Sequence, residues 1–299
     1  MRTTKRFTPK VLARFVREGR GTGIYEEYIP WHRVSRGDPA SRGRSHLLQW
    51  KDRLRELLSD GELGAQLFAV MLPDLDDSLE QYRLEQGSSQ HPLAAYQDWA
   101  AHELFPGTLE IAAKLGIKHP LVSGDGQSGA WVPTTDLLLV RRPTGQRRQL
   151  MAASFKSEAA EELTKRTKEL LSLEREYWRY RHAVWLLITP AQFDHRVVLT
   201  LRRTAAWALD MSVDVQTRAL AFSTANGMPN HSLTQILNSL TALVGDHFLA
   251  QRALWQSVWR GELPIDLRRG WRPHVPLLQV SPDEFRAFNP IASGRSACF

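Results

Sequence analysis

Residues 133–156 read PTTDLLLVRRPTGQRRQLMAASFK, two apolar blocks separated by a polar stretch that contains proline and glycine. Each block has the length of a β-strand, and proline and glycine favour a tight turn between strands. The sequence therefore predicts a β-hairpin, with Asp136 entering the first strand and Lys156 leaving the second. Antiparallel pairing brings the end of one strand beside the start of the other, so we expect these two side chains to lie close together. Ser154, two residues before Lys156, shares its face of the strand.

A carboxylate, a polar side chain and a lysine at one end of a hairpin form the pattern of PD-(D/E)xK nucleases. Phosphodiester hydrolysis adds negative charge to the phosphate oxygens, and divalent cations held by carboxylates neutralise that charge and activate water. A lysine beside the metal can orient the water or stabilise the pentavalent phosphorus. Ser154 stands where this pattern has an acidic residue. The hairpin alone therefore also fits a solvated hairpin with a surface lysine.

Length and composition limit the class of protein. The chain has 299 residues, enough for two domains that each bury a core. Lys and Arg outnumber Asp and Glu by 39 to 32, and the net charge of +7 favours a polyanionic partner. The single cysteine, Cys298, excludes internal disulfides and cysteine-based zinc sites. We find neither a signal sequence nor an apolar run of membrane-helix length, and expect a cytoplasmic protein without a membrane segment.

Segments before and after the predicted hairpin have apolar residues at helical spacing. Apolar spacing predicts helices over residues 60–71, 93–104, 109–115 and 158–181 and a buried strand over residues 184–189. The acidic residues 74–85 predict no definite element. The order helix, strand, strand, helix, strand indicates an α/β core with a mixed sheet.

Pro190 marks a change of pattern, because the chain beyond it is mostly helical. We therefore predict one domain over residues 1–190 and a second over residues 191–299. The second has predicted helices over 192–209, 232–244 and 246–259, then a short hairpin and a tail. Three helices followed by a hairpin is a winged-helix layout, and such domains bind either DNA or protein.

Two glutamates outside the hairpin are candidate site residues. Glu62 follows Ser59 at the spacing of a capping box, which would satisfy the first turn of a helix. The alternative is a metal-binding carboxylate on a helix packed against the sheet. Glu174 lies in the long predicted helix, where a solvated charge is the ordinary interpretation.

Two basic segments are candidate phosphate contacts. Residues 41–46 form a basic loop with small residues, in which Arg42 and Arg44 are the expected phosphate ligands. A flexible surface loop explains the same residues equally well. Lys118 and His119 lie in a second predicted turn, where the ordinary interpretation is also a surface position.

Several short segments occur together in the order that one known family has them, across about residues 18–190. They are Glu18-Gly19-Arg20-Gly21, Tyr28-Ile29-Pro30-Trp31, Gly43-Arg44-Ser45-His46, Leu57-Leu58-Ser59-Asp60 with Glu62-Leu63, Gly116-Ile117-Lys118-His119-Pro120, Thr135-Asp136, Leu173-Glu174-Arg175 with Tyr177-Trp178, and Trp185 before Thr189. On these segments the chain resembles TnsA, the endonuclease subunit of heteromeric cut-and-paste transposons. It is longer than the family pattern between Asp74 and Phe105.

The resemblance implies a restriction-endonuclease-like core that binds Mg²⁺, with Mn²⁺ as a possible substitute. Glu62 and Asp136 match the metal-binding carboxylates and Lys156 matches the catalytic lysine. The carbonyl of Phe155 would be a further metal ligand. The resemblance also assigns two weaker site candidates, Ser154, which stands where the family has Gln, and Glu174.

The resemblance further implies cleavage of the 5′ strand at transposon-end DNA. A separate DDE transposase (TnsB-like) would cut and join the 3′ strand, and an AAA+ ATPase (TnsC-like) would regulate the reaction, through the second domain and tail. Two alternatives stay open: a catalytically degenerate scaffold that binds DNA and partners, favoured by Ser154, and a free-standing restriction-type or repair nuclease.

Overall fold

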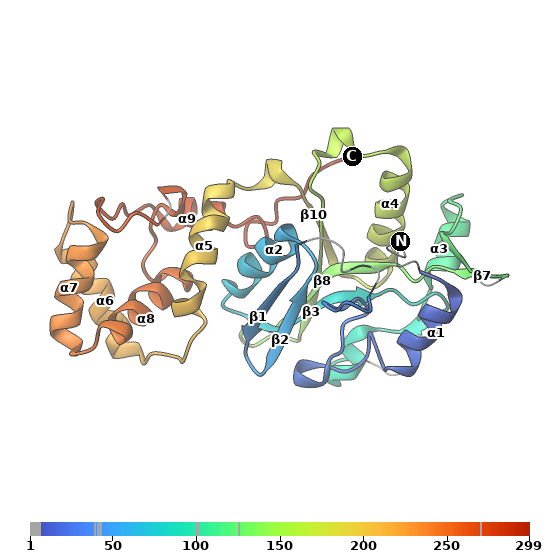
Figure 1. The fold of residues 1–299 in the computed structure, drawn as a ribbon, viewed down its shortest axis with the longest axis horizontal. Helices are drawn as coiled ribbons and strands as arrows, with labels where there is room; N and C mark the ends of the chain where they lie inside the picture. Colours follow the sequence, from blue (N-terminus) through green and yellow to red (C-terminus); the bar gives the residue numbers. More distant parts are fainter. Residues whose placement is uncertain (1–6, 39, 41–43, 100–101, 125, 270) are drawn as a thin grey trace. The chain divides into compact units, whose positions relative to one another are not determined.

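The computed structural model describes residues 7–38, 40, 44–99, 102–124, 126–269 and 271–299 (Figure 1). The chain divides into two compact units. The first contains residues 1–66, 74–189 and 296–299, and the second contains residues 67–73 and 190–295. This division differs from the predicted domains in two places, because residues 67–73 join the helical unit and the last four residues join the α/β unit.

The first unit is built on a four-stranded mixed sheet of order β10-β9-β8-β3. The strands are β3 (Leu75–Arg83), β8 (Thr134–Arg141), β9 (Gln149–Phe155) and β10 (Val184–Ile188). Strands β8 and β9 pair antiparallel, with Leu137 opposite Ala153. β9 and β10 run parallel and are joined through the crossover helix α4 (Lys165–Tyr180). The predicted hairpin and the predicted α/β class with a mixed sheet are both confirmed.

Burial explains why the hairpin forms the centre of the sheet. Residues 137–140 of β8 are fully buried and residues 150–153 of β9 nearly so, as the continuous apolar runs require. Helix α4 contributes Leu173, Tyr177 and Trp178 to the same buried cluster.

The remaining elements of the first unit surround this sheet. They are the helices α1 (Pro9–Arg17), α2 (Asp60–Val70) and α3 (Thr108–Lys114), and the short strands β1 (His46–Trp50), β2 (Arg53–Leu57), β4 (Ser89–Gln90), β5 (Leu104–Phe105), β6 (Leu121–Gly124) and β7 (Gln127–Ala130). The helices predicted over 60–71 and 109–115 are confirmed. The helix predicted over 93–104 is wrong: a 3₁₀ turn over Pro92–Tyr96 ends at Gln97, whose φ of 60° is left-handed.

The second unit contains α5 (His195–Ala208), α6 (Val215–Gly227), α7 (Leu233–Val244), α8 (His247–Trp259) and α9 (Pro282–Phe288). Helices α5 to α8 each begin at an Asp or Ser whose side chain accepts a backbone N–H of the first turn. Such caps satisfy donors that a helix start leaves unpaired. Helix α8 is buried along most of its length, because α5, α6 and α7 all pack against it.

The predicted three helices are present, but α6 and α9 were not predicted. The expected wing also differs. Within the described part of residues 263–279, pairing consists of an isolated bridge from Ile265 to Gln279, and a further bridge joins Ser232 to Pro276. No helix in the described part of the chain is long and apolar enough to span a membrane.

The tail returns to the first unit and contacts the edge strand β10. Ala297 N donates to the carbonyl of Leu187 at 2.8 Å, and Leu187 N donates to Ser296 Oγ at 2.9 Å. The ring of Phe299 packs edge-on against Trp185 with 6.2 Å between centroids. In Figure 1 the C-terminus lies near α4 and β10.

Candidate active site

Three elements bring two carboxylates together. Asp136 lies near the start of β8 and Glu62 in the first turn of α2. Gln81 of β3 donates from Nε2 to Glu62 Oε2 at 3.1 Å and to Asp136 Oδ1 at 3.4 Å. The structure therefore places the two predicted metal-binding carboxylates within hydrogen-bond distance of one nitrogen.

The end of β9 completes this arrangement. Phe155 N donates to Asp136 Oδ2 at 2.7 Å, as expected where antiparallel strands meet. Lys156 Nζ donates to the carbonyl of Phe155 at 3.1 Å. Burial opposes the charge of Lys156, but the carboxylates of Asp136, Glu174 and Glu62 together outweigh it and raise its pKa. The lysine is therefore an ammonium group beside the carboxylate pair.

Glu62 has the hydrogen bonds that the capping interpretation predicts, and its side chain also faces the site. It accepts hydrogen bonds from Leu58 N at 2.9 Å and Ser59 Oγ at 3.2 Å, and its own N–H donates to Ser59 Oγ. Its side chain thus caps the start of α2 and still faces Gln81. Burial and then the nearby charge of Asp136 raise the pKa of Glu62 to about 8.

Ser154 and Glu174 belong to a buried polar group next to the pair. Glu174 Oε1 accepts from Ser154 Oγ at 2.5 Å and from Thr135 Oγ1 at 2.6 Å. Thr135 in turn accepts from the indole of Trp178 at 2.7 Å. Glu174 is 7% exposed, so the interpretation as a solvated helix charge is wrong. Burial raises its pKa, although the two hydroxyl donors oppose that shift.

The predicted phosphate contacts lie in two places. Arg42 lies outside the described residues. Arg44 has an exposed side chain and pairs with Asp60 at 3.3 Å, at the start of the helix that carries Glu62. Lys118 and His119 lie between α3 and β6; the His119 ring is within 3.1 Å of Thr108 Oγ1, and burial lowers its pKa.

Gln81 is the member of the site that the sequence did not reveal. It lies in residues 74–85, where acidic and apolar side chains alternate too irregularly to predict a strand. The structure makes this segment the edge strand β3, which runs antiparallel to β8. A glutamine in a segment of unassigned structure carries no signal of its own.

The donor atoms fit a hard divalent cation. Among the described residues, no group of three or more His, Cys, Asp or Glu side chains is arranged to hold a metal ion. The site instead offers the carboxylates of Glu62 and Asp136 and the carbonyl of Phe155. Mg²⁺ is commonly bound through one or two carboxylates, with water and substrate phosphate as further ligands. These oxygen donors therefore suit Mg²⁺ or Mn²⁺.

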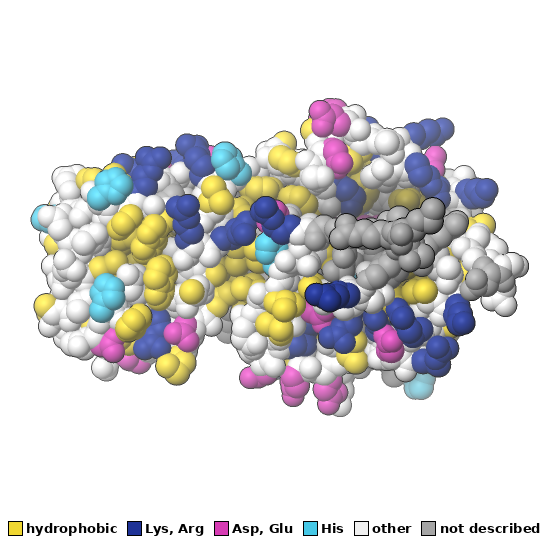
Figure 2. All heavy atoms as spheres, in the orientation of Figure 1, with side chains coloured by type: hydrophobic (Ala, Val, Ile, Leu, Met, Phe, Trp, Pro, Cys, Tyr) yellow, Lys and Arg dark blue, Asp and Glu magenta, His cyan; other side chains and the backbone are white. Residues whose placement is uncertain are grey.

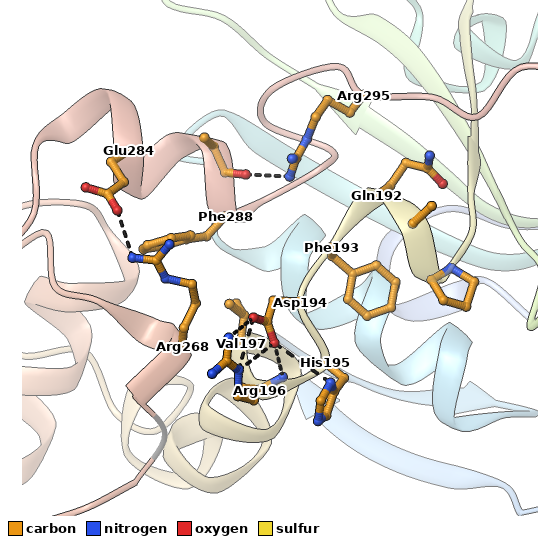
Figure 3. Close-up of a pocket in the computed structure, with 13 residues that line it drawn as sticks. Gln192, Phe193, Asp194, His195, Arg196, Val197, Arg268, Glu284, Phe288 and Arg295 are labelled. Atoms are coloured by element: carbon orange, nitrogen blue, oxygen red, sulfur yellow. Dashed lines mark hydrogen bonds and ion pairs between the residues drawn. The ribbon is translucent and has the colours of Figure 1, made fainter. Parts of the chain in front are cut away.

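A separate cavity of 980 Å³ lies in the second unit, between the start of α5 and α9 (Figure 3). Its three arginines are all engaged. Arg196 pairs with Asp194 at 2.5 Å, Arg268 pairs with Glu284 at 2.8 Å, and Arg295 donates to the carbonyl of Ala287. Carboxylates thus offset two of the three positive charges. The predicted site residues all belong to the other unit.

Positive side chains are not restricted to the first unit. Figure 2 shows Lys and Arg side chains on the surface of both units on the face that it presents. The excess positive charge of +7 is thus available to both units for contact with a polyanion.

Comparison with known proteins finds a relative of similar sequence. The chain is 33% identical over 190 residues to the transposon Tn7 transposition protein TnsA of Escherichia coli. The match covers 63% of this chain and 59% of the length of that relative. It confirms the resemblance to TnsA predicted from the sequence. No protein-family model matches the chain.

Proposed function

We propose that this chain is the endonuclease subunit of a heteromeric transposase, and that it cleaves the 5′ strand at transposon ends in a reaction that requires Mg²⁺. The observation that carries the proposal is the convergence of Glu62, Asp136 and Lys156 at one end of the hairpin. The similarity to a transposition protein supplies the biological setting. The hairpin, the parallel strand β10 and the helices α2 and α4 support a restriction-endonuclease-like core.

Each residue has a role that follows from its position. Glu62, Asp136 and the Phe155 carbonyl would hold the cation. A cation there would neutralise charge on the phosphate and lower the pKa of the attacking water. The Lys156 ammonium can donate a hydrogen bond to that water or to a phosphate oxygen. Arg44, at the start of α2, is placed to contact the phosphate backbone.

We infer that the partners are transposon-end DNA, a DDE transposase that cuts and joins the 3′ strand, and an AAA+ ATPase regulator. The second unit and the tail are the proposed contact region for DNA or partners.

The test is a transposition assay with all partners, in which both strands are mapped at each end. Asp136→Ala removes a metal-binding charge but no apolar core, so folding should survive while 5′ cleavage falls by several orders of magnitude. The 3′ strands should still be cut and joined, which shifts the products from simple insertions to cointegrates. Wild-type 5′ cleavage by the folded variant would show that the assigned site is wrong.

One observation favours a second candidate function. Ser154 stands at the position of the third acidic ligand, and its hydroxyl donates to Glu174, as expected in a degenerate nuclease kept as a DNA- and partner-binding scaffold. The same assay decides: a wild-type chain that leaves the 5′ strand intact in Mg²⁺ and Mn²⁺ with every partner present is a scaffold. Cleavage of plasmid DNA by the chain alone would instead indicate a free-standing nuclease.

A further inference from the structure

The backbone at Gln81 is unusual for a strand. Gln81 has a φ of +49°, in the left-handed region that residues with a side chain rarely adopt. It stands between the ladder pairs Glu80–Leu137 and Tyr82–Thr135. Its carbonyl accepts the N–H of Trp31 at 3.3 Å. This carbonyl therefore binds a residue outside the β3–β8 ladder.

Neighbouring contacts hold the strand in this conformation. The preceding residue, Glu80, is fully buried, and both its oxygens bind the guanidinium of Arg53, at 2.5 and 2.6 Å. The carbonyl of Glu80 accepts from Tyr28 Oη at 3.1 Å. Strained backbone persists where surrounding contacts fix it, and it occurs most often at functional sites.

In this conformation the side-chain amide of Gln81 contacts the carboxylates of both Glu62 and Asp136. Gln81 is 4% exposed, and its Oε1 accepts from Thr134 Oγ1 at 3.1 Å. Its Nε2 donates to Glu62 and Asp136. An amide is a neutral donor, so it offsets the repulsion of two carboxylates without bringing a positive charge that would compete with a cation.

We propose that Gln81 is a positioning residue, which holds Glu62 and Asp136 at the spacing that a divalent cation requires. This inference rests on the proposed function, since it concerns the same cation site. Groups that hydrogen-bond to metal ligands fix the orientation of those ligands, and their loss typically weakens metal affinity about 10–100-fold.

The experiment measures Mn²⁺ binding to the full-length chain by calorimetry and by the electron paramagnetic resonance of the bound ion, without DNA. Asp136→Ala identifies the binding event that belongs to this site. Gln81→Met keeps the length of the side chain but removes its donor, and should weaken that event about 10–100-fold. Thr134→Val, which frees Gln81 Oε1, should weaken it less, by several-fold.

Gln66→Met is the matched control. Gln66 is a fully buried glutamine of α2, and its Oε1 accepts from Ser78 Oγ at 2.7 Å. Its replacement removes a similar buried amide and should leave Mn²⁺ affinity unchanged.

The outcomes separate this inference from the function on which it rests. If wild type binds Mn²⁺ in an Asp136-dependent way and Gln81→Met binds it equally or more tightly, the positioning role is wrong and the metal site stands. If Gln81→Met does not fold, unchanged affinity in Thr134→Val overturns the role instead. If wild type shows no Asp136-dependent binding, the metal site itself is wrong and this inference falls with it.

Discussion

The Ser154 hydroxyl is directed at Glu174, to which it donates at 2.5 Å, rather than at the carboxylate pair. A hydroxyl is also a weaker ligand for Mg²⁺ than a carboxylate. We therefore predict that Ser154→Ala keeps most of the 5′-strand cleavage, within about tenfold of wild type. Rates at the transposon end in the presence of all partners measure this. A loss as large as that in Asp136→Ala would make Ser154 a necessary group.

Glu174 should lower stability in its charged form. Burial raises its pKa above the ordinary value of 4.5, so between that value and the higher folded value the folded chain binds more protons than the unfolded chain. Stability therefore falls as the pH rises through this window. Glu174→Gln removes the charge, and we predict that it raises Tm at pH 7 by about 2–4 °C. The gain should disappear below about pH 4.5 in thermal melts.

Glu176 on the same helix is the control for this prediction. Its hydrogen bond from Arg179 lowers its pKa, so the charged form of Glu176 stabilises the fold and Glu176→Gln should lose stability at neutral pH. If Glu174→Gln also loses stability at pH 7, the hydroxyl donors and Lys156 outweigh the cost of burying Glu174.

At the level of secondary structure, the hairpin was predictable and the edge strand β3 was not. Residues 133–156 carry their own signal, two apolar runs around a turn, which fixed the relation between Asp136 and Lys156. Strand β3 is held by contacts distant in the sequence, such as the pair between Glu80 and Arg53. Patterns of neighbouring residues cannot reveal such distant contacts. Gln81 was therefore not identified from the sequence as a site residue.

The tail is hydrogen-bonded to the edge strand β10, and the contribution of this contact to stability can be tested. Ala297→Pro removes the N–H that donates to Leu187, whereas Ala297→Gly keeps it. Loss of one such bond costs about 1 kcal/mol. We predict that the proline variant unfolds more easily than the glycine variant and exchanges the amides of β10 faster. Equal hydrogen exchange in the two variants would show that the tail does not stabilise β10.

For the whole molecule, the sequence pattern changes from α/β to helical at Pro190, but it gives no sign of the short segments that the two units exchange. The last turn of the helix that begins at Asp60 ends at Val70, and residues 67–73 nevertheless belong to the helical unit. The last four residues belong to the α/β unit. Tertiary packing decides to which unit such a short segment belongs. The spacing of apolar residues along the sequence does not reveal that packing.

Limited proteolysis tests this organisation. The connection after Thr189 should be cut preferentially, because it joins two compact units, leaving an amino-terminal fragment of about 190 residues on a denaturing gel. The two fragments should nevertheless elute together from a native sizing column, since each contains a segment that packs within the other's unit. Ala297→Pro removes one hydrogen bond between the tail and β10 and should make separation easier. Preferential cutting inside α4 would contradict the boundary, and immediate separation of the wild-type fragments would contradict the exchange of segments.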